Sequence, residues 1–410
     1  MNPYLLVILV ALLAQYLLHL AADLLNLRSL EPRLPDEFRD VYDAERYQKS
    51  QEYTRTKTRF GLVPETFQLV VLLVFWFAGG FAWFDAWTRG LGFGPIVTGL
   101  VFMGVLGVAR MLLGLPFRWY GTFVIEERFG FNKTTPRTFW ADLVKGLALS
   151  VVLGAPLLAG ILWFFEATGA AAWLWCWGLM TAFTVVLQFV APTWIMPIFN
   201  KFQPLDDGEL RSAVMDYAGK VDFPLEGLFV IDGSRRSTKA NAFFTGFGKR
   251  KRVALFDTLI EKQSVSELVA VVAHEIGHYK KGHITKGMVL SVLQSGAIFF
   301  LLSLFLGQEQ LFGAFGVETP SVHAGLVFFS LLFAPIDLVL SFAMSAFSRK
   351  NEYEADAFAR ETTGKPEELV SALKQLAADS LQNLTPHPFY VKLHYSHPPL
   401  LKRIEALRGS

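Results

Sequence analysis

The sequence predicts an all-α polytopic membrane protein with seven transmembrane helices and a small α+β domain outside the bilayer. Of its 410 residues, 52% are hydrophobic and 14% are aromatic, and the mean hydropathy is +0.37. This composition is too apolar for a water-soluble globular protein. The formal net charge is only +2, and the charged residues are concentrated between the apolar runs. The chain therefore has no general basic field that would bind a nucleic acid.

Seven apolar runs are long enough to cross a bilayer, which takes about 20 residues in a helix. They cover residues 3–24, 65–84, 95–115, 143–165, 171–191, 287–307 and 324–346. The first run lacks a basic segment before it and is too long for a cleaved signal peptide, so we expect it to remain as a span. The predicted parts are five spans (1–191), a polar segment (192–286), two spans (287–346) and a polar C-terminal segment (347–410).

Lysine and arginine alternate between the two sides of these spans. The linkers after spans two, four and six contain one arginine, Arg89, and no lysine, whereas the segments after the odd-numbered spans are rich in both residues. Because short loops rich in lysine and arginine stay cytoplasmic, we expect the N-terminus outside. The C-terminus and both polar segments are then expected in the cytoplasm.

The first polar segment predicts a small sheet followed by a helix. The runs LFVIDG (228–233) and RVALFDTLI (252–260) are rich in β-branched and aromatic residues and flank NAFFTGFG, which is typical of strands. The following SVSELVAVVAHEIGHYKKGH predicts a helix with Ser264 or Ser266 as N-cap and Glu267 in the first turn.

This helix carries the pattern HEIGH, which is typical of a zinc peptidase. His274 and His278 are four residues apart, so they lie on one helix face and can bind one ion. Glu275 is placed to hold a water on that ion, as in HExxH metallopeptidases. Zinc lowers the pKa of bound water from ~15.7 to ~7, and the glutamate accepts the proton. An isolated HExxH also arises by chance, so a third ligand is required.

The third ligand has to come from elsewhere in the chain. The single cysteine, Cys176, lies in an apolar run, which excludes an intrachain disulfide and a cysteine-based zinc site. A metzincin would have a histidine where this chain has Ile284. In SRKNEYEADAFARE, Glu352 and Asp356 are four residues apart, so one could bind metal while the other orients a histidine. The alternative is an ordinary charged helix face.

Three motifs together resemble the integral-membrane CAAX prenyl proteases of type 1, a family of gluzincin peptidases. These are HEIGHYKKGH, SRKNEYEADAFA and YSHPPLLKRIEAL. The segments FVIEERFGFN (123–132), MPIFNKFQPL (196–205) and DGSRRSTKANAFFTGFGKRKRVALFDTLI (232–260) resemble the family in the same order. The resemblance implies that His274, His278 and Glu352 bind one zinc ion. It also implies that Glu275 is the general base and that Asp356 orients a zinc histidine.

The resemblance further implies three residues that act on the substrate. His397 would donate a hydrogen bond near the scissile carbonyl, and Arg403 would contact the substrate or brace the site. The alternative for both is a helix N-terminus with Ser396 as cap. NAFFTG (241–246) resembles an edge strand along which an extended peptide lies, with Asn241 as a substrate-binding residue. An ordinary hairpin is the alternative.

Two further histidines are expected to be structural or interfacial rather than ligands. His19 lies within the first span. With 3.6 residues per turn, His283 lies about 140° around the same helix from His278.

The predicted function is a zinc-dependent membrane endopeptidase that cuts near the cytoplasmic face, as do proteases that remove the last three residues of a prenylated CAAX tail. A general membrane quality-control peptidase and a non-enzymatic metal-binding scaffold are the alternatives, although a transporter would place its ligands inside the spans. The expected partners are a peptide or protein substrate and the lipid bilayer. A short linker after span six and the absence of an ER-retrieval signal at LRGS favour a prokaryotic member in a bacterial inner membrane.

Overall fold

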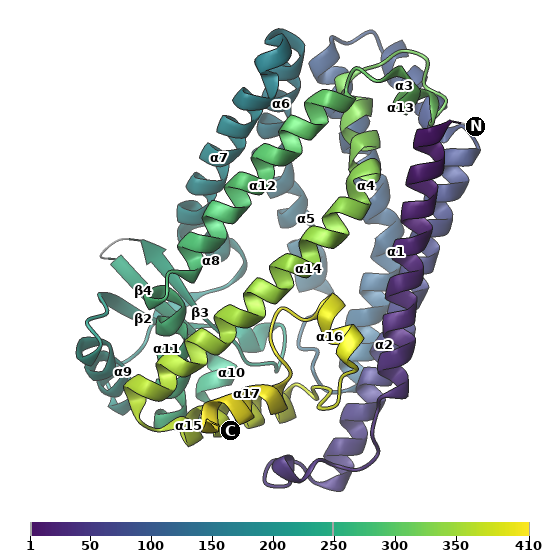
Figure 1. The fold of residues 1–410 in the computed structure, drawn as a ribbon. Helices are drawn as coiled ribbons and strands as arrows, with labels where there is room; N and C mark the ends of the chain where they lie inside the picture. The colour runs from purple at the N-terminus through teal and green to yellow at the C-terminus, as the bar shows by residue number, and fades with distance from the viewer. Residues whose placement is uncertain (1, 248–249, 410) are drawn as a thin grey trace.

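The computed structural model describes residues 2–247 and 250–409. In this part of the chain, seven helices are long and apolar enough to cross a membrane. They form an elongated bundle, and the sheet and most of the short helices gather at one end of it (Figure 1). The predicted polytopic helical fold with a small mixed domain is therefore confirmed.

The candidate spans are longer than the apolar runs that predicted them. The first three are α1 (Pro3–Arg28), α2 (Ala44–Phe77) and α4 (Pro95–Tyr120), which continues through Gly121–Glu126. The fourth span consists of α5 (Pro136–Leu149), the segment Ser150–Gly154 and α6 (Ala155–Ala167). The fifth span consists of the segment Gly169–Ala171, α7 (Ala172–Val190), the segment Ala191–Ile195 and α8 (Met196–Phe199). The last two are α12 (His283–Phe305) and α14 (Val322–Thr363).

The second span ends earlier than residue 84, where its apolar run ends. Helix α2 stops at Phe77 because Gly79 has a positive φ of 76°, a conformation that glycine adopts without strain. A new helix, α3 (Gly80–Gly90), begins directly after it. A Cβ at Gly80 would lie 2.4 Å from the ring of Phe75, so the turn also requires a residue without a side chain.

Helix α14 joins the last span to the segment that carries Glu352. It has 42 residues and is therefore about 63 Å long, twice the ~30 Å of a hydrocarbon core. The predicted boundary at residues 346 and 347 lies inside this helix. One face of the second half is buried, and it carries Glu352 and Asp356.

The sheet has the strand order β1-β2-β4-β3. Its strands are β1 (Phe202–Pro204), β2 (Leu225–Ile231), β3 (Ala242–Phe247) and β4 (Arg250–Phe256). Strands β2 and β4 are parallel, whereas β1 and β3 are antiparallel to their neighbours. The two predicted strands are thus present, and β3 lies at an edge, as predicted for NAFFTG. The three-residue β1 is too short to be predicted from a periodic pattern.

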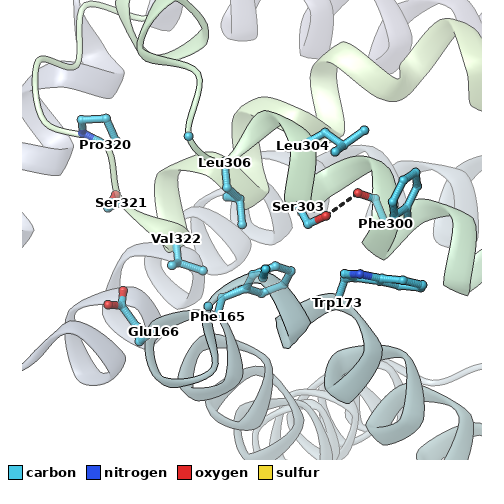
Figure 2. Close-up of a pocket in the computed structure, with 13 residues that line it drawn as sticks. Phe165, Glu166, Trp173, Phe300, Ser303, Leu304, Leu306, Pro320, Ser321 and Val322 are labelled. Atoms are coloured by element: carbon cyan, nitrogen blue, oxygen red, sulfur yellow. Dashed lines mark hydrogen bonds between the residues drawn. The ribbon is translucent and has the colours of Figure 1, made fainter.

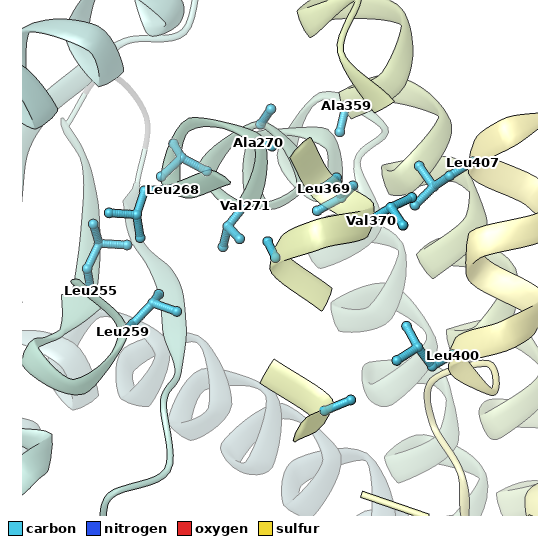
Figure 3. Packing of buried hydrophobic residues seen from close by; sticks show 14 of the residues in the cluster. Leu255, Leu259, Leu268, Ala270, Val271, Ala359, Leu369, Val370, Leu400 and Leu407 are labelled. Carbon is cyan, nitrogen blue, oxygen red and sulfur yellow. The ribbon is translucent and has the colours of Figure 1, made fainter. Parts of the chain in front are cut away.

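Helix α11 (Val265–Lys280) lies at the centre of the extramembrane domain. Its buried side chains Leu268 and Val271 face Leu255 of β4 and Leu259 of α10 (Asp257–Ile260) (Figure 3). The core is completed by α9 (Glu209–Lys220), α15 (Pro366–Asp379) and α17 (Leu400–Arg408). Two short helices, α13 (Glu309–Gly313) and α16 (Pro388–His394), lie outside this core. Residues that precede span six in the sequence and residues that follow span seven therefore build one hydrophobic core.

Candidate metal centre

Helix α11 is fixed at its N-terminus by Ser264. The hydroxyl of Ser264 accepts a hydrogen bond from the backbone N–H of Glu267, and the Glu267 carboxylate accepts one from the backbone of Ser264. This capping box satisfies helix-end donors that otherwise have no intrahelical partner. The prediction of Ser264 as one of two possible caps is confirmed.

A glycine allows α11 and α14 to approach closely. A Cβ at Gly277 would lie 3.0 Å from the carbonyl oxygen of Ala355 and 3.1 Å from its Cα. Any larger residue at position 277 would therefore push the two helices apart. Because Gly277 lies next to His278, and Ala355 lies next to Asp356, this contact sets the distance between the two histidines and the carboxylates of α14.

His274, His278 and Glu352 converge at this contact. The two Nε2 atoms are 3.1 Å apart, His278 Nε2 is 3.3 Å from Glu352 Oε1, and His274 Nε2 is 3.6 Å from Glu352 Oε2. Zinc bonds of about 2.0–2.2 Å in a tetrahedral site separate neighbouring ligand atoms by roughly 3.3–3.6 Å. In the described part of the chain, these three residues form the one group of three potential ligands. Their donor atoms and spacing fit a zinc ion.

The charge balance of the centre also fits a divalent cation. Glu352 is 4% exposed, and its Oε2 has no hydrogen bond among the described residues. The carboxylates of Glu275, Glu352 and Asp356 share one guanidinium, that of Arg403. One Zn²⁺ would neutralise the two negative charges that remain.

Asp356 and Arg403 hold the first histidine in place. Asp356 Oδ1 lies 2.8 Å from His274 Nδ1, which leaves Nε2 of the ring for the metal. Arg403 donates from Nε to Asp356 Oδ2 at 2.8 Å and from Nη2 to Oδ1 at 2.6 Å, and its Nη1 is 3.6 Å from Glu352. Arg403 is 8% exposed. The geometry therefore supports bracing, the second of the two roles considered for Arg403.

A second chain of contacts holds His278. Its Nδ1 lies 3.0 Å from His283 Nδ1, and His283 Nε2 lies 3.0 Å from Glu354 Oε2. If His278 Nε2 binds metal, its Nδ1–H can donate to His283, and His283 can donate from Nε2 to the carboxylate. The expected position of His283, about 140° away on the same helix, is wrong because α11 ends at Lys280. Gly282, with φ of 70°, reverses the chain so that α12 starts at His283.

The contact of His283 predicts an effect on metal affinity. Replacing His283 with alanine should weaken zinc binding about tenfold or more, because the orienting partner of His278 is lost. Glu354→Gln should weaken it in the same direction, because His283 loses the carboxylate that accepts its hydrogen bond. Competition with a fluorescent zinc chelator would measure the change. Glu361→Gln, at an exposed position further along α14, should bind zinc like the parent. Equal affinities in all variants would show that the His283 contact is irrelevant to the metal.

The ionisable groups around the metal ligands have shifted pKa values. Burial raises the pKa of Glu275, Glu352 adds to this effect, and the two neighbouring histidines oppose it. Burial disfavours charge on His278, but the Glu352 carboxylate outweighs it and raises the pKa of the histidine. A half-buried glutamate with a raised pKa is a stronger base than a free one, as a general base requires.

His397 lies at the exposed rim of the centre. Its Nε2 is 3.4 Å from Glu352 Oε1, its side chain is 63% exposed, and burial of its surroundings lowers its pKa. Ser396 Oγ lies 2.9 Å from His397 Nδ1, so a ring with its hydrogen on Nε2 can donate into the site. The expectation that Ser396 caps a helix is wrong, since α17 starts at Leu400 with Pro399 as its N-cap.

A cavity of about 380 Å³ is lined by two residues that lie next to Glu352 and by the segment before β3. Ala240, His397 and Arg403 line it, together with Leu373 and Leu376 of α15. Asn241 follows Ala240 and is exposed. Its backbone carbonyl accepts from Phe256 N at 3.0 Å, and its side chain accepts from the next backbone N–H. Asn241 thus lies between Ala240, which lines the cavity, and the first residue of β3.

The remaining candidate positions are remote from metal chemistry. The ring of His19 packs against that of His394 at 5.0 Å, which agrees with a structural role.

A larger cavity of about 610 Å³ lies at the other end of the bundle, between the ends of α6 and α12 and the starts of α7 and α14 (Figure 2). Its lining combines apolar side chains with Ser303, Ser321 and one carboxylate, that of Glu166.

Comparison with known proteins gives matches over almost the whole chain. Residues 23–201 match the model of the CAAX prenyl protease N-terminal region with five membrane helices, and residues 204–410 match peptidase family M48. The CAAX prenyl protease 1 homolog of Arabidopsis thaliana is 37% identical, covering 97% of this chain and 96% of that protein. CAAX prenyl protease 1 of Saccharomyces cerevisiae is 35% identical, covering 92% and 89%. The crystal structure of Ste24p from S. mikatae is 33% identical, with a TM-score of 0.94 over 99% of both chains.

Proposed function

The chain belongs to peptidase family M48 and is a zinc-dependent integral-membrane endopeptidase, and we propose that it removes C-terminal tripeptides from prenylated CAAX proteins. The observation that carries the proposal is the convergence of His274, His278 and Glu352 beside Glu275 at one end of a bundle of spans. The proposed substrate class is the one named in the curated relatives.

Each residue of the centre has a proposed role in peptide hydrolysis. His274, His278 and Glu352 hold the zinc ion, which supplies polarisation of the scissile carbonyl and a lowered pKa of water when bound. Glu275 accepts the proton of the attacking water and delivers it to the leaving amine. His397 donates from Nε2 to the carbonyl oxygen as negative charge develops on it.

The edge strand supports a proposal for how the substrate is held. Strand β3 pairs with β4 on one side only, so its other edge can pair with an extended peptide. Asn241 immediately precedes β3, and its neighbour Ala240 lines the cavity that reaches His397. Backbone pairing of this kind fixes a peptide across the centre with little dependence on its sequence.

We also propose an orientation and a division of the chain. The bias of lysine and arginine supports a cytoplasmic location for the metal-centre end. The shared hydrophobic core supports a catalytic domain built from residues 192–286 and 347–410, carried by the spans in 1–191 and 287–346.

The substrate proposal predicts selective cleavage of a lipidated peptide. The purified protein should cut a farnesylated CAAX peptide before its last three residues faster than the unprenylated twin, and faster than an unrelated peptide of equal length. Chelation of zinc should stop all cleavage, and added zinc should restore it. Equal rates on the three peptides would instead support a general quality-control peptidase, and the proposed substrate class would be wrong.

A further inference from the structure

The segment between β2 and the edge strand β3, residues 232–241, is attached to the loop that follows the third span. Asn132 and Ser237 form an isolated antiparallel bridge, and Thr238 N donates to the carbonyl oxygen of Phe131 at 3.1 Å. The segment that leads into the proposed substrate-binding strand is therefore held by the loop after the third span as well as by the sheet.

Lys239 is the centre of this attachment. Its Nζ donates to Glu126 Oε2 at 2.8 Å and to Tyr53 Oη at 2.7 Å, while Tyr53 Oη donates to Glu126 Oε1 at 2.6 Å. The ammonium also lies 4.3 Å from the ring centroid of Phe131, within cation–π range. We call Tyr53, Glu126 and Lys239 the Lys239 cluster. It connects α2, the end of the third span and the segment before β3.

The cluster is shielded enough to be rigid. Tyr53 is 6% exposed, and the side chains of Glu126 and Lys239 are 24% and 32% exposed. Burial lowers the pKa of Lys239, and the Glu126 carboxylate opposes this effect. Each polar atom of the triangle has a partner in it, so loss of Lys239 removes the two hydrogen bonds that fix the segment before β3. Glu126 then keeps the hydrogen bond from Tyr53 and the ammonium of Lys57, which is 3.7 Å from its Oε1. A surface lysine on a flexible stem would have no such fixed position.

The segment after Lys239 leads to the cavity beside His397 and into the edge strand. The carbonyl oxygen of Lys239 accepts a hydrogen bond from Thr258 Oγ1 at 3.2 Å. The next residue, Ala240, lines the cavity shared with His397 and Arg403, and Asn241 is the last residue before β3. A shift of Lys239 therefore displaces the start of β3 relative to the metal ligands.

We propose that Lys239 is a positioning residue for the peptide substrate, acting through the Lys239 cluster. This inference rests on the proposed docking of the substrate along β3. Lys239 touches no metal ligand, so its loss should weaken the binding of the peptide along β3 and leave zinc in place. Weaker binding that affects the substrate and the transition state equally raises KM and leaves kcat unchanged.

The experiment compares Lys239→Met, which keeps the apolar stem, with Lys239→Arg, which keeps the charge. With the farnesylated CAAX peptide, KM of Lys239→Met should rise about tenfold and kcat should stay within about twofold of the parent. Lys239→Arg should recover most of the loss, and Lys239→Met/Glu126→Gln should be little worse than Lys239→Met alone. Zinc content and melting temperature should match the parent in every variant.

Arg128→Met is the matched control, because Arg128 pairs with Glu52 and so joins α2 to the same loop without touching residues 232–241. It should have the KM of the parent. If Lys239→Met does not fold, Glu126→Gln carries the same test with the lysine intact. An active Lys239→Met with the KM of the parent would refute the positioning role. A raised KM together with a lowered kcat and melting temperature, equal in both lysine variants, would also refute it. A parent that cleaves no peptide would instead overturn the proposed function.

Discussion

Replacing Glu275 with glutamine will abolish peptide cleavage and leave the zinc ion bound. Glutamine has nearly the same shape as glutamate but cannot accept a proton at neutral pH, so the attacking water keeps its proton. General base catalysis contributes about 10²- to 10⁴-fold, and we expect a fall of about that size in kcat. The metal should remain because His274, His278 and Glu352 are untouched. Steady-state cleavage and metal analysis on the same preparation measure both results.

The matched control for this variant is Glu261→Gln, which changes an exposed glutamate just before α11. It should have the kcat and zinc content of the parent. Cleavage by Glu275→Gln at the parental rate would show that another group accepts the proton. Loss of zinc from Glu275→Gln would show that Glu275 helps to bind the metal, in conflict with the assigned roles.

Replacing Arg403 with methionine should strongly destabilise the protein. Arg403 is buried and binds both carboxylate oxygens of Asp356. Removing one partner of a buried ion pair costs about 3–5 kcal/mol, because the other charge stays uncompensated. Here that charge is Asp356, which also orients His274. We expect a lower melting temperature and a weaker affinity for zinc.

This result would separate bracing from substrate contact for Arg403. A substrate-binding arginine would change KM and leave the melting temperature and zinc content of the resting enzyme unchanged. Arg408→Met is the matched control on the same helix, since Arg408 forms exposed ion pairs with Glu37 and Glu367. Exposed ion pairs contribute about 0–1 kcal/mol each, so this variant should melt close to the parent.

The metal ligands could be predicted from sequence because helix geometry is local. The spacing of His274 and His278 fixes their common face, and the cap at Ser264 is equally local. Glu352 lies 74 residues beyond His278, and its partnership was predicted from the resemblance and from the i, i+4 spacing to Asp356. The contact that joins the two helices, Gly277 against Ala355, is a packing event with no periodic signal.

The wrong predictions all concern helix ends, where glycine or proline changes the course of the chain. The glycine pair at 79 and 80 lies within an apolar run, so hydropathy continued the second span past the true helix end. Gly282 in KKGH is the kind of glycine that ends a helix, and reading it so would have moved His283 toward His278. The prolines after His397 delay the last helix to Leu400, which removes Ser396 from its predicted capping position.

Direct observation of the metal tests the central claim of a shared zinc centre. Crystals of the zinc-bound protein, with anomalous scattering recorded on both sides of the zinc absorption edge, would locate the ion. We predict one peak within bonding distance of the Nε2 atoms of His274 and His278 and a carboxylate oxygen of Glu352, with an open position facing Glu275. A peak bound without Glu352, or no peak between α11 and α14, would contradict the account.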